Sequence, residues 1–384
     1  MNNNKKNVMV LAGEVSGDMH GAALIHELKK LDHDLEVYGI GGNSMKNEGA
    51  ILICHLNRMA FLGFVEVVKH IPFIKKVQLE LIDLVKEKNI DTVVLIDYPG
   101  FNLNIAEKLK ALNVKIAYYI SPQIWAWGKN RIEKIKRLID KMIVVFPFEQ
   151  KIYQDAGVDA DYVGHPLMEI IHEHKYLAKE EIFKEFGLDT SKDILLLMPG
   201  SRKHEVEKIF PNIIKAAQKL AAAFNMQIVV SASQNIHEDF LVHIAKNKQF
   251  KVITGHTYEL MKYSRFGIIK SGTSTLEAAI FQLPMVIVYK TSGLTHFIGK
   301  RLIKLKNIGM ANIILNQQVV PELIQHDASP KMIFEKCKEI LSSSELYDSM
   351  KQKLGLVKEK LGEGGASKKA AHIIFEMMND TQKN

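Results

Sequence analysis

The chain has 384 residues, of which 47% are hydrophobic and 24% are charged. This length and composition allow two domains with substantial cores and exclude a disordered or collagen-like chain. The 51 Lys and Arg residues outnumber the 43 Asp and Glu residues, and the net charge of +8 suits a nucleic acid, a phosphorylated substrate or an anionic membrane. Two cysteines, Cys54 and Cys337, cannot form a disulfide framework and indicate a reducing, cytoplasmic compartment.

Short β-branched runs alternate with helical patterns through the first half of the chain. Strands are predicted at residues 8–12, 35–38, 92–96, 115–119 and 142–146, with helical patterns at 21–31, 74–87 and 104–112. This alternation predicts a mostly parallel sheet covered by helices on both faces. The first run is too short for a signal peptide, and no apolar run approaches the ~20 residues of a membrane-spanning helix.

A polar stretch from about residue 172 separates the two halves, and its His172, Glu173 and His174 are interpreted as solvated. The alternation restarts at residue 193, with further strands predicted at 227–231, 251–253, 267–269 and 285–289. We therefore expect two similar α/β units facing a cleft. Ligands bind such units at the carboxyl ends of the parallel strands.

Acidic residues follow two strands of the first half. The first strand runs into Gly-Glu-Val-Ser-Gly-Asp at 13–18, where Glu14 is well placed for substrate. Ser16 and Asp18 are candidate contacts to a sugar or acyl group. An ordinary tight turn with Ser16 or Asp18 as the helix cap is the alternative. Asp97 directly follows the third predicted strand. A partly buried carboxylate there can act as a general base, although capping the next helix is an alternative role.

Both tryptophans of the chain fall in the loop after the fourth predicted strand. Trp125 and Trp127 stand there with Ser121 and Gln123. Aromatic faces stack on sugars or acyl chains while polar groups orient them, so this loop is a candidate sugar or acyl surface. A loop that merely fills the core is the alternative.

Phosphate-binding patterns follow two strands of the second half. After Pro-Gly-Ser, Arg202 can grip a phosphate with two hydrogen bonds. A later helix opens with small hydroxylated residues that make an anion cradle, namely Ser271, Gly272, Thr273, Ser274 and Thr275. Glu277, one turn further, is predicted to accept hydrogen bonds from ribose hydroxyls. An ordinary capped helix is the alternative.

No convincing set of metal ligands is visible, so no metal is predicted. The Asp-x-Asp patterns at 32–34 and 159–161 precede strands rather than ending them, and they are interpreted as polar turns. The charge of a bound phosphate would then be met by Arg202 and by helix dipoles.

An apolar and basic segment at 61–76 is the first of three candidates for contact with an anionic membrane, with 129–141 and 297–306. Its predicted membrane-facing residues are Phe61, Leu62, Val65, Val68, Lys69, Phe73 and Ile74. A core helix with solvated lysines is the alternative for each segment. Binding to nucleic acid is disfavoured because no recognition motif accompanies the charge.

Seven motifs together resemble the lipid-A-disaccharide synthase family, in family order and over nearly the whole chain. They lie at 12–18, 38–42, 96–102, 119–127, 163–166, 197–202 and 271–277. The Ser-Pro-Gln-Ile-Trp-Ala-Trp loop is the most specific, and Val15 stands where the family usually has Ala.

The resemblance implies an α/β GT-B fold, with two Rossmann-like domains facing a cleft. Residues 1–170, plus C-terminal helices from about 350 to 384 that cross back, would form the acceptor and lipid domain, and 171–349 the UDP-sugar domain. It implies metal-independent, inverting transfer without a cofactor. Asp97 would be the base, with Glu14 as positioner or substitute, and Asn312 would lie near the nucleotide.

The implied donor is UDP-2,3-diacylglucosamine and the implied acceptor is 2,3-diacylglucosamine 1-phosphate. The products would be the β-1,6-linked disaccharide 1-phosphate and UDP, made by a cytoplasmic enzyme bound peripherally to the inner membrane of a Gram-negative bacterium. A UDP-sugar 2-epimerase and a nucleotide-binding membrane scaffold are the competing interpretations. The oligomeric state, a homodimer included, stays open.

Overall fold

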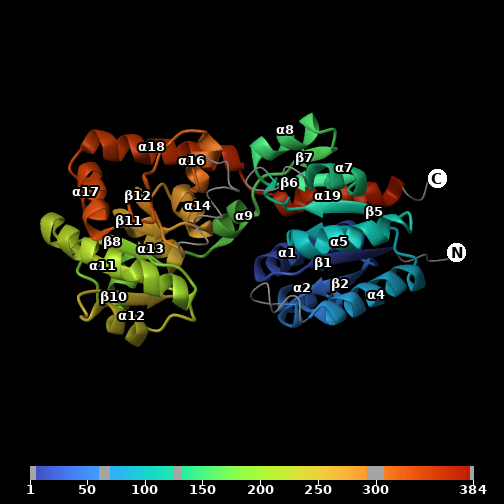
Figure 1. Ribbon diagram of the computed structural model, residues 1–384, viewed down its shortest axis with the longest axis horizontal. Coiled ribbons are helices and arrows are strands. Elements are labelled where there is room, and N and C mark those ends of the chain that lie inside the picture. Colours follow the sequence, from blue (N-terminus) through green and yellow to red (C-terminus); the bar gives the residue numbers. More distant parts are fainter. Residues whose placement is uncertain (1–5, 60–69, 125–130, 292–306, 381–384) are drawn as a thin grey trace. The chain divides into compact units, whose positions relative to one another are not determined.

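The computed structural model describes residues 6–59, 70–124, 131–291 and 307–380 (Figure 1). It divides into two compact units: unit 1 comprises Met1–Ile170 and Leu361–Asn384, and unit 2 comprises Ile171–Lys360. The chain thus returns to unit 1 about ten residues later than the sequence suggested. The reason is α18 (Ser344–Leu361), where the Tyr347 hydroxyl donates to the Arg265 carbonyl of unit 2 at 2.7 Å.

Unit 1 is built on a sheet of seven parallel strands in the order β3-β2-β1-β4-β5-β6-β7. The central strands are continuous apolar runs, because both of their faces are covered. The strands are β1 (Asn7–Ala12), β2 (Glu36–Gly41), β3 (Ile51–His55), β4 (Thr92–Ile96), β5 (Lys115–Tyr119), β6 (Lys141–Val144) and β7 (Ala160–Tyr162).

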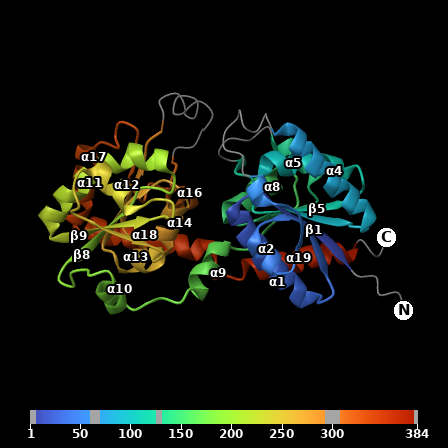
Figure 2. The ribbon, with the colours of Figure 1, turned by 90° about the horizontal axis from the view of Figure 1, so that it is seen from below.

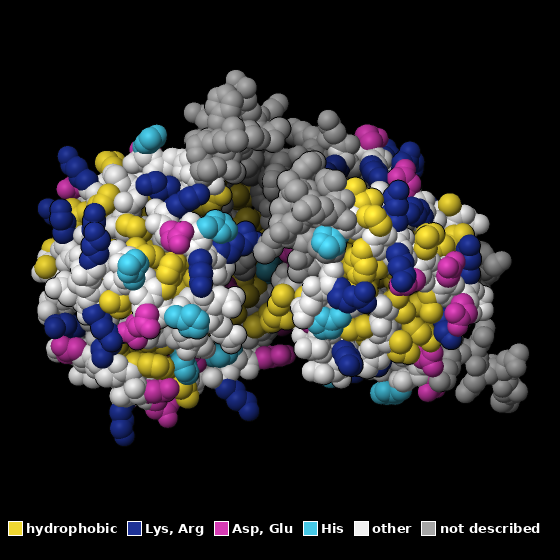
Figure 3. Space-filling view, turned by 60° about the horizontal axis from the view of Figure 1, so that its bottom comes forward, with side chains coloured by type: hydrophobic (Ala, Val, Ile, Leu, Met, Phe, Trp, Pro, Cys, Tyr) yellow, Lys and Arg dark blue, Asp and Glu magenta, His cyan; other side chains and the backbone are white. Residues whose placement is uncertain are grey.

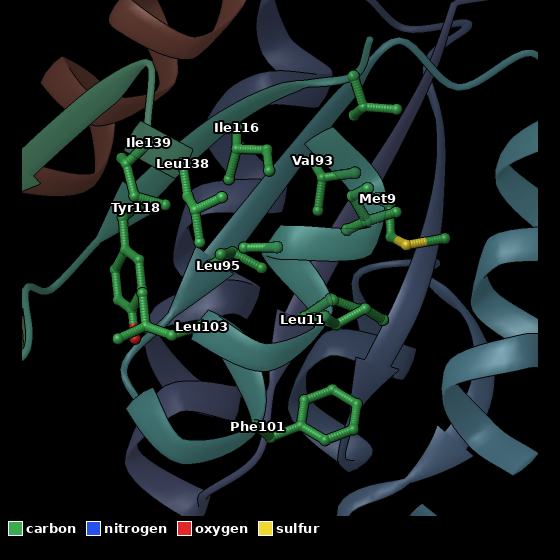
Figure 4. Packing of buried hydrophobic residues seen from close by; sticks show 14 of the residues in the cluster. Met9, Leu11, Val93, Leu95, Phe101, Leu103, Ile116, Tyr118, Leu138 and Ile139 are labelled. Atoms are coloured by element: carbon green, nitrogen blue, oxygen red, sulfur yellow. The ribbon is translucent and has the colours of Figure 1, made fainter. Parts of the chain in front are cut away.

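Helices cover both faces of this sheet. They are α1 (Val15–Leu31), α2 (Asn43–Asn47), α4 (Ile71–Glu87), α5 (Pro99–Lys110), α7 (Ile132–Leu138), α8 (Pro147–Asp155) and α19 (Ala366–Asp380), with a 3-10 turn at Leu56–Arg58. The division between the two units falls within a further helix, α9 (Pro166–Glu173). In Figure 2, α4 and α5 lie on one side of β1 and β5, and α1, α2 and α19 lie on the other. The core beneath α5 includes Met9, Leu11, Val93, Leu95 and Phe101 (Figure 4).

The C-terminal helix α19 belongs to unit 1, which confirms the predicted crossing back. It packs along α1. Glu169 stabilises its first turn, because its two carboxylate oxygens accept from the Ser367 amide at 2.8 Å and from the Ser367 hydroxyl at 2.7 Å. Near its other end, the Lys6 ammonium donates to the Asn379 side chain at 2.6 Å. Buried Ala370, Ile374 and neighbouring residues complete one layer of unit 1.

Unit 2 is built on six parallel strands in the order β10-β9-β8-β11-β12-β13. They are β8 (Asp193–Met198), β9 (Met226–Ala232), β10 (Lys251–Thr254), β11 (Phe266–Lys270), β12 (Met285–Tyr289) and β13 (Glu322–Ile324). Besides α18, the helices are α10 (Lys179–Glu185), α11 (Lys203–Phe224), α12 (Glu238–Ala245), α13 (Thr257–Tyr263), α14 (Thr273–Ile280), α16 (Met310–Leu315) and α17 (Pro330–Leu341). Each unit therefore has the Rossmann-like α/β architecture that the sequence predicts.

Among the residues that the structure describes, no helix combines the length and the apolar character needed to cross a bilayer. Basic side chains are spread over both units on the face drawn in Figure 3, rather than gathered in one stripe. A continuous stripe would be the footprint of a nucleic-acid surface.

Candidate active site

Three adjacent strands of unit 1 end at a cavity of about 310 Å³. Glu14 follows β1, Asp97 follows β4, and Ser121 and Gln123 follow β5, and all four line this cavity. The carboxyl ends of neighbouring parallel strands meet at one edge of a sheet, which is why these residues converge although they are far apart in the sequence. Trp125 and Trp127 lie outside the described residues.

The backbone at Asp97 is held in an uncommon conformation. Asp97 and Tyr98 both have φ of 45°, in the left-handed region, which non-glycine residues adopt only when their surroundings hold them there. The Asp97 carbonyl accepts from the Tyr118 hydroxyl at 2.5 Å and from the Asn102 side-chain amide at 2.7 Å. Asn102 is buried and donates also to Ile96. These two buried donors fix where β4 ends and so where Asp97 stands.

The electrostatics of this cavity suit Asp97 to accept a proton. Burial and, to a lesser extent, the Glu14 carboxylate raise the pKa of Asp97 to about 6, against a smaller opposing effect of the Tyr98 amide. A general base works best when its pKa lies near the working pH. A carboxyl group of this pKa is ionised at neutral pH and is more basic than an exposed aspartate.

The residues after Glu14 divide between the surface and the interior. Glu14 and Ser16 are exposed. Asp18 is buried, and its carboxylate accepts from the amides of Gly42, Ser44 and Met45 at 2.6, 3.0 and 3.1 Å. Both oxygens are thereby occupied at the start of α2, so the structure replaces the expected sugar contact of Asp18 with a structural role.

The candidate membrane segments are only partly described. Phe61, Leu62, Val65, Val68 and Lys69 lie outside the described residues, as do residues 297–306. Phe73 and Ile74 on α4 are half-buried and pack against the core of unit 1.

The candidate segment at 129–141 is described from residue 131 onward. Within it, Lys134 and Arg137 on α7 pair with Glu107 of α5 at 3.0 and 2.8 Å. That pairing offsets part of the segment's positive charge.

Unit 2 has a larger cavity, of about 620 Å³, at the carboxyl ends of β8, β9 and β11. Gly200 turns the chain there with φ of 115°, a conformation that favours glycine. Arg202 then caps α11 and lines the cavity with its side chain two-thirds exposed. Its side chain is therefore free to turn onto an anion.

The predicted cradle at the start of α14 lies on this cavity only in part. Gly272, Thr273 and Ser274 line it, so the amides of an eight-residue helix open towards the space. The buried Thr275 hydroxyl donates instead to the Gly272 carbonyl at 2.7 Å, and the Ser271 amide donates to β12. These two residues shape the loop rather than line the cavity.

Glu277 also lines the unit 2 cavity, and it accepts from the Tyr258 hydroxyl at 3.4 Å. Burial raises the pKa of Glu277. A carboxylate there has free acceptor capacity for ligand hydroxyls, as expected for a ribose contact.

Asn312 lies in the interior of unit 2. It is fully buried on α16 and does not line the cavity. Its side-chain oxygen accepts from the amides of Val319 and Val320 at 2.7 and 2.9 Å, and its nitrogen donates to Val320 and Glu322 at 2.9 and 2.7 Å. All of its hydrogen-bonding capacity is used inside the unit, which gives Asn312 a structural role, and its expected place near the nucleotide stays a prediction.

The Asp-x-Asp pattern at 159–161 overlaps β7 rather than preceding a strand as expected, and it is paired with a cation. Asp159 and Asp161 flank the Lys141 ammonium at 2.8 and 2.7 Å. Among the described residues, no group of three or more His, Cys, Asp or Glu side chains is arranged to hold a metal ion.

Comparison with known proteins identifies the family. A family model described as lipid-A-disaccharide synthetase matches residues 8–375. The lipid-A-disaccharide synthase of Geobacter sulfurreducens is 39% identical over 379 residues, which is 98% of each chain. That of Coxiella burnetii is 36% identical over 374 residues, 97% of this chain and 99% of its own. The chain belongs to the lipid-A-disaccharide synthase family.

Solved structures confirm the predicted GT-B fold of this chain. UDP-GlcNAc 2-epimerase from Neisseria meningitidis bound to UDP-GlcNAc has a TM-score of 0.67 at 12% identity, covering 96% of this chain and 100% of its own. The calicheamicin glycosyltransferase CalG4 has a TM-score of 0.61 at 11% identity, covering 98% of each chain. At such low identity the likeness concerns the fold alone.

Two candidate site residues could not be recognised from the sequence. Arg131 lines the same cavity as Asp97. His174 lines the unit 2 cavity instead of being solvated, and its Nε2 lies 2.8 Å from a carboxylate oxygen of buried Glu259. Neither residue stands in a motif, and only the fold brings them to the cavities.

Proposed function

We propose that this chain condenses UDP-2,3-diacylglucosamine with 2,3-diacylglucosamine 1-phosphate. The products are the β-1,6-linked disaccharide 1-phosphate and UDP. The observation that carries the proposal is the half-buried Asp97 carboxyl, with its pKa of about 6, at the strand ends of unit 1. An inverting transfer needs one such base and no protein nucleophile.

In the proposed reaction, Asp97 takes the proton of the acceptor 6-hydroxyl. The hydroxyl oxygen forms a bond to the anomeric carbon of the donor as the bond from that carbon to the UDP oxygen breaks. UDP leaves with the electron pair, and the α-linked donor becomes a β-linked product. Glu14 positions the acceptor, and the Arg131 guanidinium offers a cation to its phosphate.

In unit 2, the proposed site for UDP is the larger cavity. Arg202 and the amides at Gly272, Thr273 and Ser274 face the diphosphate, and Glu277 faces the ribose hydroxyls. The cavity volume of about 620 Å³ is within the range of small-molecule sites.

The test is a mass-spectrometric assay with both lipid substrates. Disaccharide 1-phosphate and UDP should appear in equal amounts, and only when the acceptor is present. An epimerised UDP-sugar formed without acceptor would identify a UDP-sugar 2-epimerase instead. Nucleotide binding with no turnover in either arm would identify a scaffold.

Replacing Arg202 by Ala should weaken UDP binding by about 1.5–3 kcal/mol, because the site loses a charge-assisted hydrogen bond to phosphate. Calorimetric titration of UDP into the folded variant measures this loss. Lys219→Ala on the same helix α11 removes an exposed cation outside the cavity and serves as the control. An unchanged affinity for UDP would remove Arg202 from the site.

We further propose that unit 1 binds the anionic surface of the inner membrane from the cytoplasmic side. On α4, the apolar side chains of Ile71 and Leu79 are 42% and 57% exposed, and Lys75 lies between them at helical spacing with Lys76 beside it. Apolar residues with flanking lysines on one helical stripe suit the boundary between head groups and acyl chains.

The double variant Ile71→Asp, Leu79→Asp should bind anionic vesicles about tenfold more weakly, because two apolar contacts are lost and two negative charges are gained. Co-sedimentation with vesicles containing acidic phospholipid measures this. Leu346→Asp, Leu356→Asp on α18 makes the same change at exposed positions of unit 2. Equal binding of both variants and the wild type would contradict the proposal.

A further inference from the structure

Lys270 lies in the unit 2 cavity, and the proposed mechanism gives it no role. It is the last residue of β11, its side chain is 18% exposed, and it lines the cavity beside Gly272 and Ser274. Its ammonium lies 3.1 Å from one oxygen of Glu205, in the first turn of α11. Lys270 is therefore a second cation that lines the same cavity as Arg202.

Glu205 is shared between both cations. The oxygen that receives Lys270 lies 3.9 Å from the Arg202 guanidinium, and the Glu205 side chain is only 16% exposed. Gly200 packs over this pair, because a Cβ at Gly200 would lie 3.2 Å from Glu205 and 3.5 Å from the Lys270 side chain. A carboxylate thus occupies the space between two cations, where an anionic ligand would also bind.

We propose that Lys270 is a second diphosphate-binding cation and that Glu205 is its counter-ion in the ligand-free cavity. This inference rests on the proposed function, because it takes the ligand of this cavity to be a nucleoside diphosphate. The diphosphate oxygens replace the Glu205 oxygen at Lys270 and Arg202. Glu205 keeps its charge near the amino end of the 22-residue helix α11, where the helix dipole favours an anion.

The exchange is favourable because a diphosphate carries more charge and more acceptor oxygens than one carboxylate. Without Glu205, the half-buried ammonium would stand without a counter-charge until ligand arrived, which is costly. Glu205 therefore keeps both cations in place and competes weakly with the ligand. Removing the lysine and removing the glutamate should consequently have opposite effects on binding.

The test is calorimetric titration of the whole protein with UDP and with uridine. Lys270→Met should weaken UDP binding by about tenfold or more and leave uridine binding unchanged, since only UDP carries the diphosphate. Lys270→Arg should keep the affinity for UDP within about threefold. Glu205→Gln should tighten UDP binding by about threefold or more, because the competing charge is gone. Thermal melting shows that each variant is folded.

Lys251→Met is the matched control. Lys251 is an exposed lysine of the same sheet, but it lies at the amino end of β10, away from the cavity at the carboxyl ends of the strands. Equal losses for UDP and uridine in Lys270→Met, or no loss, would overturn the assignment of Lys270. Weaker UDP binding in Glu205→Gln would overturn the role of Glu205 as a competing counter-ion. A wild-type protein that binds no UDP would overturn both this inference and the proposed function. If the wild type turns over the lipid substrates and Lys270→Met leaves its UDP affinity unchanged, only the inference is overturned.

Discussion

Replacing Asp97 by Asn is expected to lower turnover by about 10²-fold or more, because the amide cannot take the proton of the acceptor hydroxyl. Asn keeps the shape of the side chain and tolerates the left-handed backbone that Asp97 adopts. Steady-state assays with both lipid substrates measure the loss. UDP affinity should stay unchanged, since Asp97 lies in unit 1 and the proposed UDP site in unit 2.

The pH profile gives the second measurement for Asp97. The carboxyl must be ionised to act as a base, so wild-type activity should rise with pH and reach half of its plateau near pH 6. Activity is thus lost as the pH falls through the raised pKa. In Glu14→Gln, that midpoint should move to lower pH, because the neighbouring negative charge is removed. Near-normal turnover in folded Asp97→Asn would disprove the assignment.

Replacing Asn312 by Ala should lower the free energy of unfolding by about 3 kcal/mol or more. Two buried amides, of Val319 and Val320, and the Glu322 carboxylate each lose a partner, and an unpaired buried group costs about 1–3 kcal/mol. Urea denaturation measures the change. The control is Gln317→Ala, at an exposed position close by, which should have little effect.

The structural role of Asn312 also has a functional test. At a low temperature where the variant is still folded, its UDP affinity should be close to that of the wild type. A stable variant with a tenfold loss of UDP affinity would instead place Asn312 in contact with the nucleotide.

The sequence predicted the central strands well and the edge strands poorly. The strands predicted at 92–96, 115–119 and 285–289 coincide with β4, β5 and β12, because strands buried on both faces are unbroken apolar runs. Three of the four edge strands, β3, β7 and β13, were missed, whereas the edge strand β10 was predicted at 251–253. An edge strand is short and half-polar, so its pattern does not separate it from a loop.

The residues of the candidate site could likewise be predicted only in part. Glu14, Asp97 and Arg202 could be found because each follows an apolar strand, and a strand end is a position that sequence periodicity can locate. The structural roles of Asp18 and Asn312 could not be predicted, because their partners include backbone amides 24 to 27 and 7 to 8 residues away. The sequence around a residue does not show which backbone amides elsewhere in the chain will donate hydrogen bonds to its side chain.

The docking of α19 onto α1 has a consequence for the order of folding during synthesis. Unit 2 is continuous in the chain, whereas unit 1 needs residues from both ends. The ribosome therefore releases all of unit 2 before α19 exists to cover α1. Until then, the nascent first unit leaves uncovered the part of α1 against which α19 packs. We expect a fragment ending at residue 170 to aggregate, and the second unit to complete its fold before the first.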